Sequence, residues 1–173
     1  MVESNYNPFL YSSRGATGLW QIMPGTASGF NLDINWWYDG RRDIRASTQA
    51  AFTYLKYLHD YFDDWLLAIA AYNCGEGTVI KAIHHNKALH KPTDFWSLSL
   101  PYQTKNYLPK LLALVTIIDN PTAYNIDLPS IPNQPYFTSV DMSGQIDFSL
   151  IAKLADMSPQ SVRLLNPGYR RFT

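Results

Sequence analysis

The chain of 173 residues contains only two glutamates, and they lie in very different surroundings. Glu3 lies in a polar, turn-like stretch close to the first residue, whereas Glu76 stands between two glycines, where a solvated carboxylate is expected. A carboxyl group that donates a proton near neutral pH needs surroundings that raise its pKa. A solvated carboxylate does not meet this need, so we do not expect Glu76 to be catalytic.

A stretch rich in small residues, Gly15–Pro24, follows the first glutamate. Small residues let the backbone pass close to packed chain or to a ligand. The hydroxyl of Ser12 and the amide of Gln21, interleaved with Trp20 and Met23, would suit a polar, ring-shaped ligand. A tight turn that leads into a helix explains the same residues equally well, and both interpretations stay open at this point.

A second candidate site follows the almost wholly apolar stretch Asp64–Tyr72. It places Tyr72 and Asn73 at the C-terminal end of a predicted helix, beside a turn that contains Gly75. Taken alone, these residues favour a glycine-terminated helix with Tyr72 in the core.

Other reactive side chains give weaker signals. His84 and His85 are adjacent, and neighbouring residues of a helix point about 100° apart, so we predict no metal site there or at His90. Cys74 is expected to behave as a small buried apolar residue. The charged run Asp39–Asp43 predicts a salt-bridged loop.

The composition excludes several classes of function. Fourteen basic residues balance fourteen acidic ones, which argues against nucleic acid as a partner because such proteins favour a basic surface. The longest apolar stretches, Trp65–Ala71 and Leu111–Ile118, are too short for a membrane span. Aromatic residues make up 14% of the chain, which is typical of a cleft that stacks on flat or ring-shaped ligands.

Apolar periodicity predicts a mainly helical domain. Helices are expected over Ala46–Phe62, Asp64–Tyr72, Gly77–Asn86 and Thr104–Asp119.

The last part of the chain has a different character. Three prolines between residues 127 and 135 predict a semi-rigid linker. Beyond it we expect a short strand at Tyr136–Val140 and helices at Leu150–Ala155 and Pro159–Leu165. The predicted domains are therefore 1–126 and 136–173. Because the second domain is too small to bury much core alone, it should lean on the first domain or on a continuation of the chain.

Several separated motifs in one order resemble the lytic murein transglycosylases, in particular the membrane-bound D type. The motifs cover about residues 2–125 and are Glu3-Ser4 with Pro8, Ser12, Gly15–Pro24, Trp37–Asp39 with Arg42-Asp43, Ala70–Asn73 with Gly75, Leu100-Pro101, Thr104, Tyr107 and Pro109-Lys110. Residues 136–168 are similar to a LysM repeat, a small sugar-binding module, although the usual Gly-Asp-Thr-Leu is Gly144–Asp147 here. A degenerate structural cap is an equally good interpretation of that segment.

The resemblance implies a lysozyme-like, mostly α fold (SLT domain) followed by a small α+β LysM-like segment. It implies cleavage of the MurNAc–GlcNAc β-1,4 bond of peptidoglycan in the bacterial periplasm, without metal or cofactor. Glu3 would be the catalytic residue. The implied substrate-binding residues are Ser12, Gln21, Met23, Tyr72, Asn73, Gln103 and Tyr107.

Two departures from the family pattern affect this expectation. Gln103 stands where the family usually has Glu, and the helix that carries the catalytic Glu in the family would lie upstream of Met1. We therefore expect a fragment of a longer gene product, continued at both ends.

Two other functions remain open. A hydrolysing muramidase on the same fold would need a second carboxylate, for which Asp33, Asp39 and Asp43 are candidates. A murein-binding module without catalytic activity would also explain Gln103.

Overall fold

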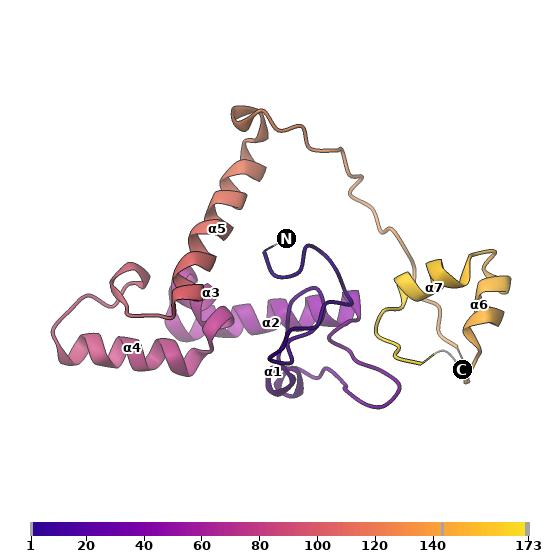
Figure 1. Cartoon of the computed structure of the whole chain (residues 1–173), viewed down its shortest axis with the longest axis horizontal. Helices are drawn as coiled ribbons and strands as arrows, with labels where there is room; N and C mark the ends of the chain where they lie inside the picture. The colour runs from indigo at the N-terminus through magenta and orange to yellow at the C-terminus, as the bar shows by residue number, and fades with distance from the viewer. Residues whose placement is uncertain (1, 143, 172–173) are drawn as a thin grey trace. The chain divides into compact units, whose positions relative to one another are not determined.

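The structure is a computed structural model that describes residues 2–142 and 144–171. Within these residues it is mostly helical, as predicted, and the only β pairing consists of isolated bridges (Figure 1). Met1, Ser143 and Phe172–Thr173 lie outside the described residues, so the outer ends of the predicted ranges 1–126 and 136–173 do too. The helices are α1 Pro24–Gly29, α2 Ile44–Phe62, α3 Trp65–Cys74, α4 Glu76–Ala88, η1 Phe95–Ser97, α5 Tyr102–Asp119, η2 Pro121–Tyr124, α6 Phe148–Leu154 and α7 Pro159–Leu165.

The contacts group the chain into two compact units. The first, here called the helical unit, contains residues 49–127, and the second, the loop unit, contains residues 3–48 together with residues 128–173. The boundary between residues 48 and 49 falls inside α2, so the two units share this helix. None of the described helices is both long enough and apolar enough to cross a membrane.

The core of the helical unit forms around α3, which packs against α4, α5 and η1 (Figure 1). Buried residues of α3 are Leu67, Ala68, Ala70 and Ala71. Leu58 and Leu108 are fully buried in the same cluster, and burying one such leucine contributes about 1.5–3 kcal/mol. The apolar helix α3 thus lies at the centre of the helical unit.

Capping residues explain why the central helices begin where they do. The Asp64 carboxylate accepts hydrogen bonds from the amides of Leu66 and Leu67 at 2.7 and 3.0 Å, which satisfies amides that have no partner in the first turn of a helix. Gly75, with φ of 88°, ends α3. Asp43 accepts from the Ala46 amide at 2.8 Å at the start of α2. Asp43 and Asp64 therefore fix where α2 and α3 begin.

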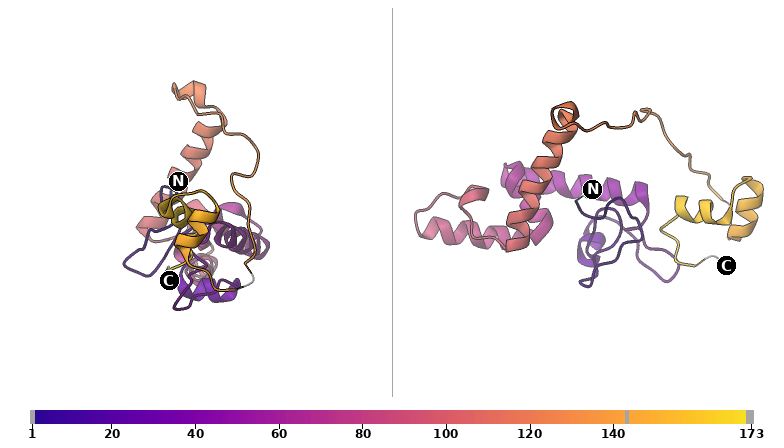
Figure 2. Two further views of the ribbon diagram at one scale, coloured as in Figure 1. Left: turned by 90° about the vertical axis from the view of Figure 1, so that its right-hand side faces the viewer. Right: turned by 45° about the horizontal axis from the view of Figure 1, so that its top comes forward.

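The predicted strand at Tyr136–Val140 is wrong. Within residues 136–142 the structure shows an extended chain without strand pairing, and Figure 2 draws it as a bare trace. A strand needs a partner for its backbone groups, and here Tyr136 and Val140 remain 92% and 74% exposed. The two predicted helices nearby are present as α6 and α7, and Asp147 and Ser158 cap their first turns.

Candidate active site

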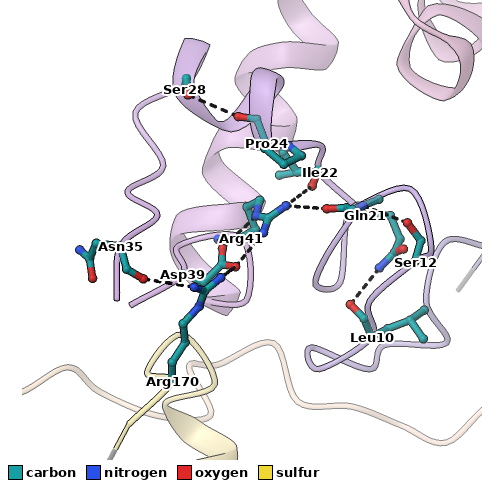
Figure 3. Close-up of polar contacts among 12 residues, drawn as sticks. Leu10, Ser12, Gln21, Ile22, Pro24, Ser28, Asn35, Asp39, Arg41 and Arg170 are labelled. Atoms are coloured by element: carbon teal, nitrogen blue, oxygen red, sulfur yellow. Dashed lines mark hydrogen bonds and ion pairs between the residues drawn. The ribbon is translucent and has the colours of Figure 1, made fainter. Parts of the chain in front are cut away.

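The segment Leu10–Ile22 is here called the substrate loop, after the substrate-binding roles expected of Ser12 and Gln21. It folds upon itself through its own polar groups. The Ser12 hydroxyl accepts a hydrogen bond from the Ala16 amide at 2.9 Å. The Gln21 side-chain amide donates to the carbonyl of Gly18 at 2.8 Å and more weakly to that of Leu10 (Figure 3). The two polar residues that the resemblance assigned to substrate binding therefore also hold the loop in shape.

Gly18 explains why small residues are needed in this loop. Its φ is +84°, and a Cβ atom there would overlap the backbone carbonyl of Arg41. The loop thus lies directly on the backbone of residues 41–42. Small residues were expected to let the backbone pass close to packed chain or to a ligand, and at Gly18 the neighbour is packed chain.

Glu3 lies in a half-buried turn of the same unit as the substrate loop. Its neighbour Ser4 is buried and donates a hydrogen bond from its hydroxyl to the Leu19 carbonyl at 2.8 Å. This bond joins the turn that carries the candidate acid to the loop that carries Ser12 and Gln21. Met23, directly after the loop, is 42% exposed and so can contact a ligand.

The other predicted site residues belong to the helical unit, where α3 and α5 meet. Asn73 at the end of α3 accepts a hydrogen bond from the Thr104 hydroxyl at 2.8 Å. Gln103 precedes Thr104 and is exposed, and Tyr107 lies one turn further along α5 and is half-buried. Tyr72 packs its ring against that of Tyr54 at 5.6 Å. Tyr72, Asn73, Gln103 and Tyr107 thus lie on two helices that pack against each other.

Tyr54 is a residue of this region that the sequence analysis missed. Burial, followed by the charge of Glu76 and a hydrogen bond to it, raises the pKa of Tyr54 to about 12. The Tyr54 hydroxyl therefore stays protonated and donates to Glu76, which is half-buried rather than solvated as we expected. In the sequence, Tyr54 falls at the three- and four-residue spacing of the apolar residues of α2. That spacing indicated only a core position.

Of the three aspartates considered for a hydrolytic mechanism, two use their carboxylate oxygens in ion pairs or hydrogen bonds within the protein. Asp39 is buried and forms ion pairs with Arg41 at 2.8 Å and Arg170 at 2.9 Å. Asp43 caps α2 and accepts from the Tyr38 hydroxyl at 2.9 Å. Asp33 is exposed. The charged run is therefore salt-bridged, as predicted, and its first carboxylate, Asp39, is shielded from solvent.

The pKa of Asp39 reflects this environment. Burial acts to raise the pKa of the carboxyl, but hydrogen bonds from Arg41 and Arg170 together with the charge of Arg41 outweigh it, and the net pKa is below the ordinary value. Asp39 is therefore an anion at neutral pH, held by two cations.

Metal ligands do not gather anywhere in the described part of the chain, where no three His, Cys, Asp or Glu side chains come together. His84 and His85 are exposed near the end of α4. Cys74 is half-buried rather than fully buried, and burial raises the pKa of its thiol.

Comparison with known proteins adds two family matches to this geometry. Residues 1–95 match the family described as the transglycosylase SLT domain. This chain belongs to the transglycosylase SLT domain family. Residues 136–173 match a second family, described as the lytic transglycosylase MltD LysM-like domain. The match at the C-terminus confirms the LysM-like resemblance even though the predicted strand does not form.

Two of the three relatives described here carry names that agree with the family. The chain is 42% identical over its whole length to the membrane-bound lytic murein transglycosylase D of Escherichia coli K12 and covers 38% of that protein. It is 40% identical over 136 residues to a putative tributyltin chloride resistance protein of Alteromonas sp. strain M-1, which covers 78% of the chain and 64% of that protein. It is 31% identical over 117 residues to the soluble lytic murein transglycosylase of E. coli K12, covering 64% of the chain and 18% of that protein. The chain thus spans about two fifths of the length of the first of these relatives.

Proposed function

We propose that this chain is the catalytic part of a peptidoglycan lytic transglycosylase. It cleaves the MurNAc–GlcNAc β-1,4 bond without water and leaves 1,6-anhydroMurNAc ends. The observation that carries the proposal is the family match over residues 1–95, which includes Glu3 and the substrate loop. The names of the relatives support murein as the substrate class.

Glu3 acts first as general acid and then as general base. Its carboxyl proton passes to the glycosidic oxygen as the bond from C1 to the GlcNAc O4 breaks. The MurNAc C6 hydroxyl attacks C1 from the same sugar, and its proton goes to the Glu3 carboxylate. Glu3 is then protonated again, and the atoms balance without water.

An intramolecular nucleophile explains why one carboxylate suffices. Most glycosidases use two carboxyl groups, one of which activates water or attacks the sugar directly. A hydroxyl already held beside C1 gains the advantage of a unimolecular reaction. The bonds that occupy Asp39 and Asp43 support this mechanism over hydrolysis, because a base that activates water needs a free oxygen lone pair facing the sugar.

The remaining site residues bind and orient the glycan. Ser12 and Gln21 hydrogen-bond the N-acetyl group or the intermediate, and Met23 packs on a sugar ring. Tyr72 and Asn73 line the subsite of the cleaved MurNAc. Gln103 and Tyr107 on α5 bind the glycan beside them.

The partner is the glycan strand of peptidoglycan, and the place of action is the bacterial cell envelope, in the periplasm. The E. coli relative is named as membrane-bound, so we also propose that the complete protein is held at the outer membrane. No nucleic acid takes part.

The identity of the products tests the proposal. Purified sacculi are incubated with the protein, and the released muropeptides are analysed by mass spectrometry. We expect 1,6-anhydro ends, which are one water lighter than reducing ends. Reducing ends would establish a hydrolase and would direct mutagenesis to the exposed Asp33. Binding to sacculi without release of muropeptides would establish a murein-binding module.

A further inference from the structure

The side chain of Arg41 links two points of the substrate loop, Gly15 and Ile22. Its Nη1 atom donates to the carbonyls of Gly15 at 2.7 Å and Ile22 at 3.3 Å. These two residues flank the turn that contains Gly18 and Gln21. The Arg41 side chain is only 4% exposed, so water cannot replace it as the donor.

Asp39 fixes the plane of that guanidinium group. Its two carboxylate oxygens accept from Nε and Nη2 of Arg41 at 2.9 and 2.8 Å, a bidentate arrangement (Figure 3). Bidentate pairs define orientation as well as distance. The direction of Nη1 toward the loop carbonyls therefore depends on where Asp39 is held.

The C-terminal segment holds Asp39 from the other side. Nη2 of Arg170 donates to the same carboxylate at 2.9 Å, across 131 positions in the sequence. The Asp39 amide donates to the Gly168 carbonyl, and the Arg170 amide donates to the Trp37 carbonyl, both at 2.8 Å. Gly168 lies so close to Tyr38 that a Cβ atom would come within 2.5 Å of its ring.

We propose that Asp39, Arg41 and Arg170 form a positioning relay through which the C-terminal segment fixes the substrate loop. All three are positioning residues, because they act through the backbone of the loop and not on the sugar. The inference rests on the proposed function insofar as the loop binds the glycan. It assigns the LysM-like segment a role in turnover, in addition to any sugar binding of its own.

The relay makes a specific prediction for Arg170. When the guanidinium group of Arg170 is removed, Asp39 is paired with Arg41 alone. The guanidinium plane of Arg41 is then less fixed, so it holds the carbonyls of Gly15 and Ile22 less firmly. A displacement of about 1 Å in a catalytic site can cost about 100-fold in rate, so we expect a partial loosening to lower kcat about tenfold. The KM for short glycan fragments changes less, since their sugars still reach the same side chains.

The test compares three variants of the full chain. Arg170→Ala removes the contact to Asp39, and Arg170→Lys restores a positive charge without the planar guanidinium group. Arg171→Ala is the matched control, because it removes a neighbouring arginine that stacks on Trp36 at 3.6 Å and does not contact Asp39. Hydrogen exchange of the amides of Ala16, Gly18 and Ile22, each bonded within the substrate loop, is measured together with kcat and KM.

We expect Arg170→Ala to speed exchange of these loop amides and to lower kcat, Arg170→Lys to recover part of both, and Arg171→Ala to leave the loop amides unchanged. Faster exchange confined to residues 159–171, or equal effects of Arg170→Ala and Arg171→Ala, would overturn the relay. If the unmodified chain releases no muropeptides, the proposed function fails, whereas the exchange of the loop amides still decides the relay.

Discussion

At the scale of single residues, Asp39 shows how a buried carboxylate contributes to stability. Its side chain is 1% exposed and is held by two arginines. Removing one partner of a buried ion pair leaves the other charge unpaired, which costs about 3–5 kcal/mol. Asp39→Asn should therefore lower the free energy of unfolding at pH 7 by that order, measured by urea denaturation. Asp60→Asn is the control, because its exposed pair with Lys56 contributes at most about 1 kcal/mol.

The same residue should give the stability a dependence on pH. The folded-state pKa of Asp39 is lowered, so its stabilisation is complete above the unfolded-state pKa of about 3.9 and is lost as the pH falls through the folded value. The difference between the unmodified chain and Asp39→Asn should therefore shrink when denaturation is repeated near pH 3. A difference that stays constant from pH 7 to pH 3 would show that Asp39 does not titrate with folding.

Gln103 is the residue at which this chain departs from the pattern of its family. It is exposed in the first turn of α5, beside the Thr104 that binds Asn73. A carboxylate there would favour positive charge developing at C1, and Gln103→Glu should raise kcat. In the proposed site Gln103 and Glu3 act on the same substrate, so a carboxylate at residue 103 should also raise the pKa of the acid and move the acid limb of the pH–rate profile. Identical profiles would mean that residue 103 has no electrostatic role, and a lower kcat would mean that the site is adapted to glutamine.

At the scale of elements, the helices could be predicted because their signals are local. Asp64 and Gly75 mark the start and end of α3, and its apolar residues all lie in one short stretch. The strand at Tyr136–Val140 could not be judged in this way, because an extended segment becomes a strand only when another segment pairs with it.

The cap of α3 offers a test at this scale. Asp64→Ala removes the acceptor for two amides and should lower the free energy of unfolding by about 1 kcal/mol. Asp60→Ala, on the exposed side of α2, is a suitable control. A loss no greater than that of the control, measured by thermal or urea denaturation, would mean that water replaces the cap.

At the scale of the whole chain, contacts across long sequence separations could not be predicted. The sequence indicated that residues 136–173 should lean on the first domain or on a continuation of the chain. In the structure Arg170, Gly168 and Tyr169 contact residues within the 35–41 stretch, and Ser139 accepts a hydrogen bond from Arg45. Charge type alone cannot choose Arg170 for Asp39 among fourteen basic residues.

Removing the C-terminal segment tests its contribution directly. A chain that ends at Asp127 loses the bonds from Arg170 and Gly168 to the 35–41 stretch, and we expect a lower melting temperature. If the segment is also a LysM-like module, the truncated chain should bind long glycan strands less tightly. A lower melting temperature with unchanged binding would contradict the module, and an unchanged melting temperature would contradict the structural contact.

The central claim is that Glu3 alone performs the acid–base chemistry, and its substitution tests this most directly. The measurement is the rate at which soluble muropeptides are released from sacculi by the unmodified chain and by Glu3→Gln, with circular dichroism and sacculus binding as controls for folding. General acid–base catalysis contributes about 10²–10⁴-fold, and because one group would serve as both acid and base we predict a loss near the upper end, with fold and binding unchanged. A rate within tenfold of the unmodified chain would contradict the account and would make Glu76 the next glutamate to replace.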